Sequence, residues 1–147
     1  MQKSEVETRV RESFDRQALM NTLGAKLDIV KDGEVHIRLP ASEHITQQHG
    51  FAHAGAIASI ADSACGYACY SKMEKDDAIL SVEFKINLLA PAAGESFLAI
   101  GKVIRSGRTI SVASAEIFAL VGNDEPKCIA VMQATMMRIE SKQGLNG

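Results

Sequence analysis

Residues 53–73, HAGAIASIADSACGYACYSKM, decide the fold of this chain. From residue 54 to residue 71 nearly every side chain is apolar or small, no proline interrupts the run, and Asp62 carries its one formal charge. A helix without a polar face is normally enclosed by other structure. The run is too rich in Ala, Ser and Gly for a membrane span of about 20 apolar residues. We therefore predict a central helix inside a globular domain. Asp62 then needs a partner or a function, because a buried carboxylate is costly.

The length and composition predict one globular domain spanning residues 1–147. A chain of 147 residues is long enough to bury a core without disulfides. Its 46% hydrophobic and 23% charged residues are ordinary values for such a domain. The formal net charge of −2 gives no general attraction to nucleic acid or to anionic lipid. We therefore expect neither a nucleic acid nor a membrane as a partner.

The N-terminus and the cysteines favour a cytoplasmic protein. Residues 1–14, MQKSEVETRVRESF, alternate charges and contain no apolar run before a cleavage site. Cys65, Cys69 and Cys128 are odd in number and lack the CxxC spacing of metal sites. We expect three reduced thiols that pack as small apolar side chains.

No cofactor is expected from the motifs of the chain. The glycine-rich signatures of nucleotide sites and the GxSxG turn of serine hydrolases do not occur. Three histidines lie before or at the start of the predicted helix, but they lack a fourth ligand at a familiar spacing. They are His44, His49 and His53. We predict no metal site.

Hydrophobic periodicity outside the central helix predicts one further helix and one antiparallel sheet. An apolar stripe that includes Val6 and Ala18 predicts an N-terminal helix over about residues 3–22, ended by Gly24. Two short strands flank Asp32-Gly33, which is a hairpin signal. Four strands are predicted after the central helix, over residues 78–89, 96–105, 109–121 and 127–138. The core then spans about residues 25–138, and a polar tail covers residues 141–147.

One sheet that curls around one apolar helix satisfies this order of elements. We therefore predict an α+β domain in which an antiparallel meander wraps a long central helix. Strict alternation in residues 78–89 would place Leu80, Val82 and Phe84 on one face of their strand and Ser81 and Glu83 on the other.

The first turn of the central helix and Asp62 both have the features of a functional site. The turn Ala54-Gly55-Ala56 leaves N–H groups open to an anion or to a carbonyl oxygen that gains negative charge. The alternative is that these small residues serve only close packing. Likewise, Asp62 is either functional or simply neutralised by an arginine or by the start of a neighbouring helix.

Asp62 cannot meet the helix start within one chain. It lies nine residues after His53, which is about half a revolution around the helix and about 13 Å along it. Two antiparallel copies of the helix about a two-fold axis would bring these features together twice.

Three segments together resemble the PaaI-like hot-dog fold acyl-CoA thioesterases. They are HGFAHAGAIASIADSACGYA at residues 49–68, SVEFKINLLAPA at residues 81–92 and VIRSGRTISVASAEIF at residues 103–118. The similarity covers about residues 45–138. It implies a hot-dog fold, in which an antiparallel sheet wraps a long central helix. It also implies hydrolysis of an acyl-CoA thioester by a homodimer or a dimer of dimers, with active sites at the interface.

The resemblance also implies roles for single residues. His53 would lie near the thioester, and the N–H of Ala54, beside Gly55, would hold the oxyanion. Asp62 of the opposite subunit would act as general base or as nucleophile, and Ser81 would help to place the water. Ala54 stands where the family has a glycine, which narrows the approach to this N–H.

Further residues are implied in substrate binding. Gly50 matches the loop glycine of the family. Gln47 replaces a loop asparagine, so that Gln47 or Gln48 is the candidate to hold the water. A basic cluster around the hairpin at Ser106-Gly107 would contact the phosphates of CoA, although such residues also serve to protect a sheet edge. The cluster consists of Lys102, Arg105 and Arg108.

Two other functions remain open at this point. A hot-dog hydratase or dehydratase would use His53 and an acid on the partner helix. A non-catalytic acyl-CoA binding or sensing module would have no turnover. Aryl and medium-chain acyl groups are equally compatible with the sequence.

Overall fold

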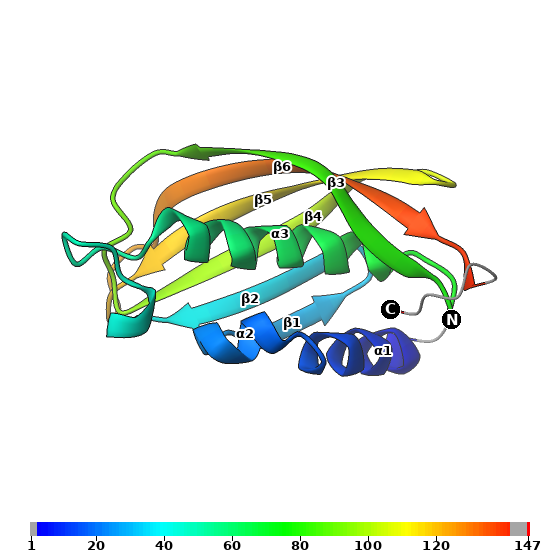
Figure 1. The fold of residues 1–147 in the computed structure, drawn as a ribbon, viewed down its shortest axis with the longest axis horizontal. Helices are drawn as coiled ribbons and strands as arrows, with labels where there is room; N and C mark the ends of the chain where they lie inside the picture. Colours follow the sequence, from blue (N-terminus) through cyan, green and yellow to red (C-terminus); the bar gives the residue numbers. More distant parts are fainter. Residues whose placement is uncertain (1–2, 142–146) are drawn as a thin grey trace.

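A computed structural model describes residues 3–141 and 147 (Figure 1). The helices of this part are α1 (Lys3–Asp15), α2 (Ala18–Leu23) and α3 (Ala54–Tyr70), with a 3-10 turn at Glu43–Ile45. The strands are β1 (Lys26–Lys31), β2 (Glu34–Pro40), β3 (Ala78–Leu88), β4 (Ser96–Ser106), β5 (Ile110–Leu120) and β6 (Lys127–Ile139). Among the described residues they form one antiparallel sheet in the order β1-β2-β4-β5-β6-β3. The sheet curls around α3, as predicted.

Helix α3 packs tightly on the middle of the sheet. Ile57, Ile60 and Ala64 are buried against it. At Gly101 of β4, a Cβ atom would lie only 2.4 Å from the carbonyl oxygen of Ala64. Only glycine lets the strand approach the helix backbone so closely.

One stripe of α3 is not covered by the sheet. Gly55, Ser59, Asp62 and Gly66 are exposed or half-buried, and their spacing places them on one face of the helix. Within one chain, the predicted enclosure of the helix is therefore incomplete at this stripe, which contains its one charge.

The predicted N-terminal helix is two helices. α1 ends at Asp15 and α2 begins at Ala18. Between them Gln17 has extended backbone angles, and its side-chain Nε2 donates a 2.8 Å hydrogen bond to the hydroxyl of Tyr67 in α3. The break moves Ala18 out of the apolar stripe and into solvent, and Met20 is buried instead.

Strand β3 departs from the predicted meander. It pairs with β6 rather than with β4, so it forms one end of the sheet. A β-bulge between Ser81 and Glu83 also breaks the expected alternation. Ser81 therefore faces α3 and reaches Asp62, whereas Leu80 faces the other way. The expected common face of Leu80 and Phe84 is wrong for this reason.

The remaining elements follow the sequence closely. The β1–β2 hairpin turns at Asp32-Gly33, and Gly24 follows the end of α2. Of the polar tail at residues 141–147, residues 142–146 lie outside the described part. In that part no helix is long and apolar enough to cross a membrane.

Candidate active site

The start of α3 carries one open backbone donor. His53 is the N-cap, and its Nδ1 accepts a 2.7 Å hydrogen bond from the N–H of Gly55. The N–H of Ala56 donates to the carbonyl oxygen of His53. Within residues 3–141, the N–H of Ala54 has no acceptor. Of the two amides predicted to hold an oxyanion, Gly55 is therefore engaged by His53, and Ala54 is available.

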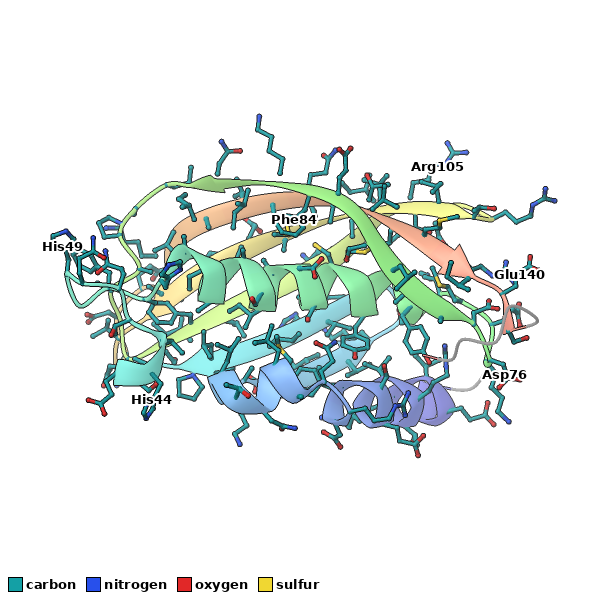
Figure 2. All side chains as sticks on the ribbon, viewed as in Figure 1. His44, His49, Asp76, Phe84, Arg105 and Glu140 are labelled. Carbon is teal, nitrogen blue, oxygen red and sulfur yellow. The ribbon has the colours of Figure 1, made fainter. Side chains whose placement is uncertain are left out.

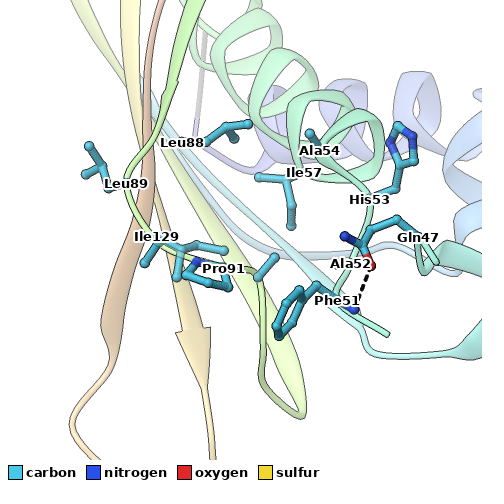
Figure 3. A pocket seen from close by; sticks show the side chains of 12 residues that line it. Gln47, Phe51, Ala52, His53, Ala54, Ile57, Leu88, Leu89, Pro91 and Ile129 are labelled. Carbon is cyan, nitrogen blue, oxygen red and sulfur yellow. Dashed lines mark hydrogen bonds between the residues drawn. The ribbon is translucent and has the colours of Figure 1, made fainter. Parts of the chain in front are cut away.

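A pocket of about 580 Å³ opens beside this helix start (Figure 3). His53, Ala54 and Ile57 line it from α3, and the segment that follows β3, including Leu89 and Pro91, lines it from the opposite side. We call it the helix-start pocket. Its lining is mostly apolar, so few groups besides the open N–H of Ala54 could stabilise a negative charge that develops beside the helix start.

The loop before α3 brings Gln47, and not Gln48, to this pocket. Gln47 Oε1 accepts hydrogen bonds from the N–H groups of His49 (2.6 Å) and Phe51 (3.2 Å; Figure 3). The side chain therefore shapes the loop with its oxygen and keeps its amide N–H groups for other partners. Gln48 is exposed and does not line the pocket. Gly50 has a φ of +87°, which favours glycine, and it closes the turn.

Asp62 lies in a second cavity. Its Oδ1 accepts a 2.7 Å hydrogen bond from Ser81 Oγ, so the bulge in β3 brings the predicted serine to the predicted acid. The cavity has a volume of about 230 Å³. We call it the Asp62 cavity; its lining includes Ser13, Gln17, Asp62, Ser63, Gly66, Tyr67, Ile79, Ser81 and Met136. None of these residues lines the helix-start pocket, so one chain separates the two halves of the predicted site.

The basic residues lie away from both cavities. Lys102 follows Gly101, which faces α3, so its side chain points to the outer face of the sheet. There its Nζ lies 3.9 Å from Glu34 Oε1. A hydrogen bond with His36, helped by the charge of Lys102, lowers the pKa of Glu34, so Lys102 already faces a carboxylate.

Arg105 and Arg108 are exposed at the end of β4 and in the hairpin loop that follows it. Figure 2 shows Arg105 at the opposite end of the molecule from His49, whose loop leads into α3. The predicted phosphate contacts and the helix-start pocket are therefore not brought together in one chain.

The thiols and histidines form no further centre in the part of the chain described. Burial raises the pKa of the Cys69 thiol to about 12 and raises that of Cys65 as well, so both stay protonated near neutral pH. His49 is exposed on its loop. No group of three or more His, Cys, Asp or Glu side chains there is arranged to hold a metal ion.

Comparison with known proteins gives the family. The model of the family described as "Thioesterase superfamily" matches residues 49–125. A thioesterase family protein from Silicibacter pomeroyi has a solved structure with a TM-score of 0.88 and 46% identity, over 91% of this chain and 98% of that one. A candidate esterase from Halobacterium salinarum is 31% identical in an alignment that covers 80% of this chain and 82% of that protein.

The chain belongs to the thioesterase superfamily. The structure of the Escherichia coli PaaI protein also matches, with a TM-score of 0.82 and 23% identity over 94% of this chain and 96% of that one, which shows a common fold. The predicted hot-dog fold and the PaaI-like resemblance are confirmed. At the level of the superfamily, the chain is a thioester hydrolase.

The sequence reasoning on this thioesterase-superfamily member missed one wall of the Asp62 cavity. Ser13 and Gln17 come from the N-terminal region, outside the matched residues 49–125, and they meet Tyr67 of α3. The helical pattern of residues 3–22 continues through Gln17 and hides the break. The amide is held by a contact 50 residues away in sequence, which no local pattern reveals.

Proposed function

We propose that this thioesterase-superfamily chain hydrolyses an acyl-CoA thioester to a carboxylic acid and CoA, at a site built from two copies of the chain. The main support for this proposal is that the two halves of the predicted site, the helix start and Asp62, are separated within one chain. Ala54 opens into the helix-start pocket, whereas Asp62 lines its own cavity about 12 Å further along α3. A thioester carbonyl needs an oxyanion donor and an activated water at the same carbon, so a second copy must supply one of them.

Asp62 and the helix start divide the reaction between them. The carboxylate of Asp62, held by Ser81, takes a proton from water as the water oxygen attacks the carbonyl carbon. The oxygen that gains negative charge is held by the N–H of Ala54 of the other copy. The C–S bond then breaks, and the CoA thiolate leaves and takes up a proton. Direct attack by Asp62 would form an anhydride that water cleaves to the same products.

Strand β3 offers the surface on which a second copy would pair. It ends the sheet, so one of its edges has no neighbouring strand within the described residues. Its apolar side chains Val82 and Phe84 are 54% and 45% exposed, which is unusual for a strand beside a core. Antiparallel pairing of two β3 edges about a two-fold axis would turn each open stripe of α3 toward the partner. A homodimer, alone or within a dimer of dimers, satisfies this geometry.

The same pairing would bring the basic residues of the β4–β5 hairpin close to the substrate. Two antiparallel copies place the hairpin end of one chain toward the helix start of the other, so Arg105 and Arg108 can reach the phosphates of a CoA bound there. Lys102 adds positive charge on the outer face. His53 stays beside the thioester, and Gln47, Gln48 and Gly50 form the loop at the pocket entrance.

The first test is Asp62→Asn. This change keeps the size of the side chain and an oxygen that can accept from Ser81, so the fold should persist. We expect kcat for a panel of acyl-CoA esters, measured by thiol release, to fall roughly 10²–10⁴-fold while CoA still binds. Asp124→Asn, in an exposed loop, is the control and should keep full activity. Unchanged turnover in Asp62→Asn would remove Asp62 from the mechanism.

The same experiment separates the two alternative functions. A hydratase or dehydratase changes the acyl group and releases no free thiol. A binding or sensing module has no turnover for Asp62→Asn to remove. Release of free CoA by the wild type, lost in Asp62→Asn, therefore supports hydrolysis over both.

A further inference from the structure

A largely buried ion pair lies near the end of β6. Arg138 Nε donates to Asp77 Oδ2 at 2.5 Å, and the two side chains are 23% and 5% exposed. Asp77 belongs to the turn between α3 and β3, where the same Oδ2 accepts from the N–H of Glu74 at 3.2 Å. Removing two charges from water is costly, and apolar side chains often stabilise a protein as well as such a pair does. Stability alone is therefore a poor reason for this pair.

The same arginine holds the loop between β4 and β5. Its Nη1 donates to the carbonyl oxygen of Arg108 at 3.3 Å, and its backbone N–H donates to the carbonyl oxygen of Thr109 at 2.8 Å. Two successive carbonyl groups of the loop are thus held by one residue. A guanidinium group is a rigid planar fork, so the carboxylate of Asp77 that fixes Nε also fixes the direction of Nη1.

The loop has further internal constraints. The N–H of Gly107 donates to Ser111 Oγ at 3.3 Å, and Ser111 is buried. A Cβ atom at Gly107 would overlap the carbonyl oxygen of Ile110. These contacts leave the backbone of the loop little freedom, whereas the side chains of Arg105 and Arg108 are exposed.

A fixed backbone favours binding by exposed arginines. A long side chain loses rotamer freedom when it binds an anion, and a mobile loop would lose backbone freedom as well. Arg138 and Asp77 hold the loop before the ligand arrives, so that only the side chains of Arg105 and Arg108 remain to be ordered.

We propose that Arg138, oriented by Asp77, is a positioning residue for CoA: it holds the loop between β4 and β5 so that Arg105 and Arg108 meet the phosphates of the thioester. Arg138 itself acts on the loop and not on the substrate. This inference rests on the proposed function, which places the phosphates of CoA at this hairpin.

The experiment compares thioesters with and without the phosphates. Benzoyl-CoA and benzoyl-pantetheine form one pair, and butyryl-CoA and butyryl-pantetheine form another; the pantetheine ester ends before the phosphates. Thiol release gives kcat/KM for each, and the ratio of CoA ester to pantetheine ester measures the use of the phosphates. We expect Arg138→Lys, in which one ammonium group replaces the fork, to lower this ratio about tenfold through a higher KM for the CoA ester. An equal fall for both esters, or an unchanged ratio, would overturn the inference.

Arg38→Lys is the matched control. Arg38 is also a strand arginine whose Nε donates to an aspartate, Asp28 at 2.8 Å, and whose Nη1 donates to a second acceptor, Ser96 Oγ at 3.4 Å. It lies opposite Leu98 of β4, whereas the hairpin follows Ser106 at the other end of that strand. The ratio should stay at the wild-type value. The same fall in both variants would contradict a specific role of Arg138.

Asp77→Asn tests the same device from the other partner. It keeps the size of the side chain and an oxygen for the N–H of Glu74, but it removes the charge that orients Arg138. The ratio should fall in the same direction as in Arg138→Lys. Thermal unfolding checks both proteins, and a normal ratio in whichever variant is folded counts against the inference.

A double-mutant cycle tests whether Arg138 acts through the two arginines. In a chain with Arg105→Ala and Arg108→Ala the ratio should already be at least tenfold lower, because the phosphate contacts are gone. The backbone carbonyl of residue 108 remains, so Arg138 keeps its partner. Adding Arg138→Lys to this chain should then lower the ratio no further. A second, independent fall would show that Arg138 acts elsewhere.

The failures of the two proposals are distinguishable. If neither CoA ester is hydrolysed by the wild type, the proposed function fails, and this inference fails with it. If the CoA esters are hydrolysed but the ratio does not depend on Arg105 and Arg108, or depends on them and not on Arg138, hydrolysis stands and only this inference fails.

Discussion

At Ala54, the role of the backbone N–H can be tested by mutation. Ala54 is the first residue of α3, and its N–H has no acceptor in the part of the chain described. Proline is well tolerated at the first position of a helix, and it removes this N–H. The preceding residue, His53, has a ψ of 139°, which suits the residue before a proline.

We therefore predict that Ala54→Pro folds normally but loses about 100-fold in kcat, the typical effect of losing one oxyanion donor. Thermal unfolding and thiol release measure the two properties. Ala54→Gly, which keeps the N–H, should retain its activity. A fully active Ala54→Pro protein would show that this amide does not hold the oxyanion.

Ser81 is expected to act through Asp62. Ser81→Ala removes the 2.7 Å hydrogen bond to the carboxylate, and we predict a fall in kcat of about tenfold with little change in Tm, because Ser81 is exposed. Ser114→Ala on β5 is the control, since it lies outside both cavities. A Tm loss without a kinetic effect would make the bond structural only.

The cysteines should differ in reactivity. Cys65 and Cys69 are buried and burial raises the pKa of both thiols, whereas Cys128 is half-buried. Only the thiolate reacts, so a disulfide reagent at pH 8 should modify Cys128 in the native protein and all three thiols after denaturation. Fast native reaction of Cys65 or Cys69 would contradict their burial.

The close packing of strand β4 against helix α3 requires a glycine at position 101. Gly101→Ala would place its methyl group 2.4 Å from Ala64 O, so the helix or the strand must move. We predict a loss of about 3 kcal/mol in the free energy of unfolding, measured with denaturant. Gly66→Ala is the matched control, because its methyl group meets only Met136 at ordinary distance. Equal stability of the two variants would contradict the observed contact.

Local signals predicted some elements well and others poorly. The apolar run of α3 and the Asp32-Gly33 turn were sufficient for the helix and the first hairpin, because both depend on neighbouring residues. The break at Gln17, the bulge beside Val82 and the pairing of β3 with β6 all depend on partners far away in sequence. Alternation alone therefore placed Ser81 and Leu80 on the wrong faces.

The candidate site was predictable only as two halves. Counting residues along the helix separated Ala54 from Asp62, and the structure places them in different cavities. The family resemblance supplied Ser81, which lies within hydrogen-bonding distance of Asp62. The wall of the Asp62 cavity at which Ser13 and Gln17 meet Tyr67 could not be foreseen, since its residues come from three separate segments.

The whole molecule exposes an apolar strand that a second copy would cover. We predict that Phe84→Glu gives a folded monomer with activity reduced at least tenfold, because a charge on β3 opposes pairing and the site is then incomplete. Light scattering gives the mass, and circular dichroism checks the fold. Ile104→Glu on β4, also an exposed apolar residue, should keep the assembly. A monomeric wild type with full activity would end the two-chain account.

Mixing two inactive variants tests the two-chain site most directly. Ala54→Pro and Asp62→Asn chains, with different tags, are co-expressed and purified as a mixture. In a mixed dimer, one site combines both defects, whereas the other combines the intact Ala54 of one chain with the intact Asp62 of the other. Random assembly makes half of the dimers mixed, so we predict recovery of about a quarter of the wild-type kcat. Activity no higher than that of the two parent variants would show that each chain carries its own complete site, contrary to this account.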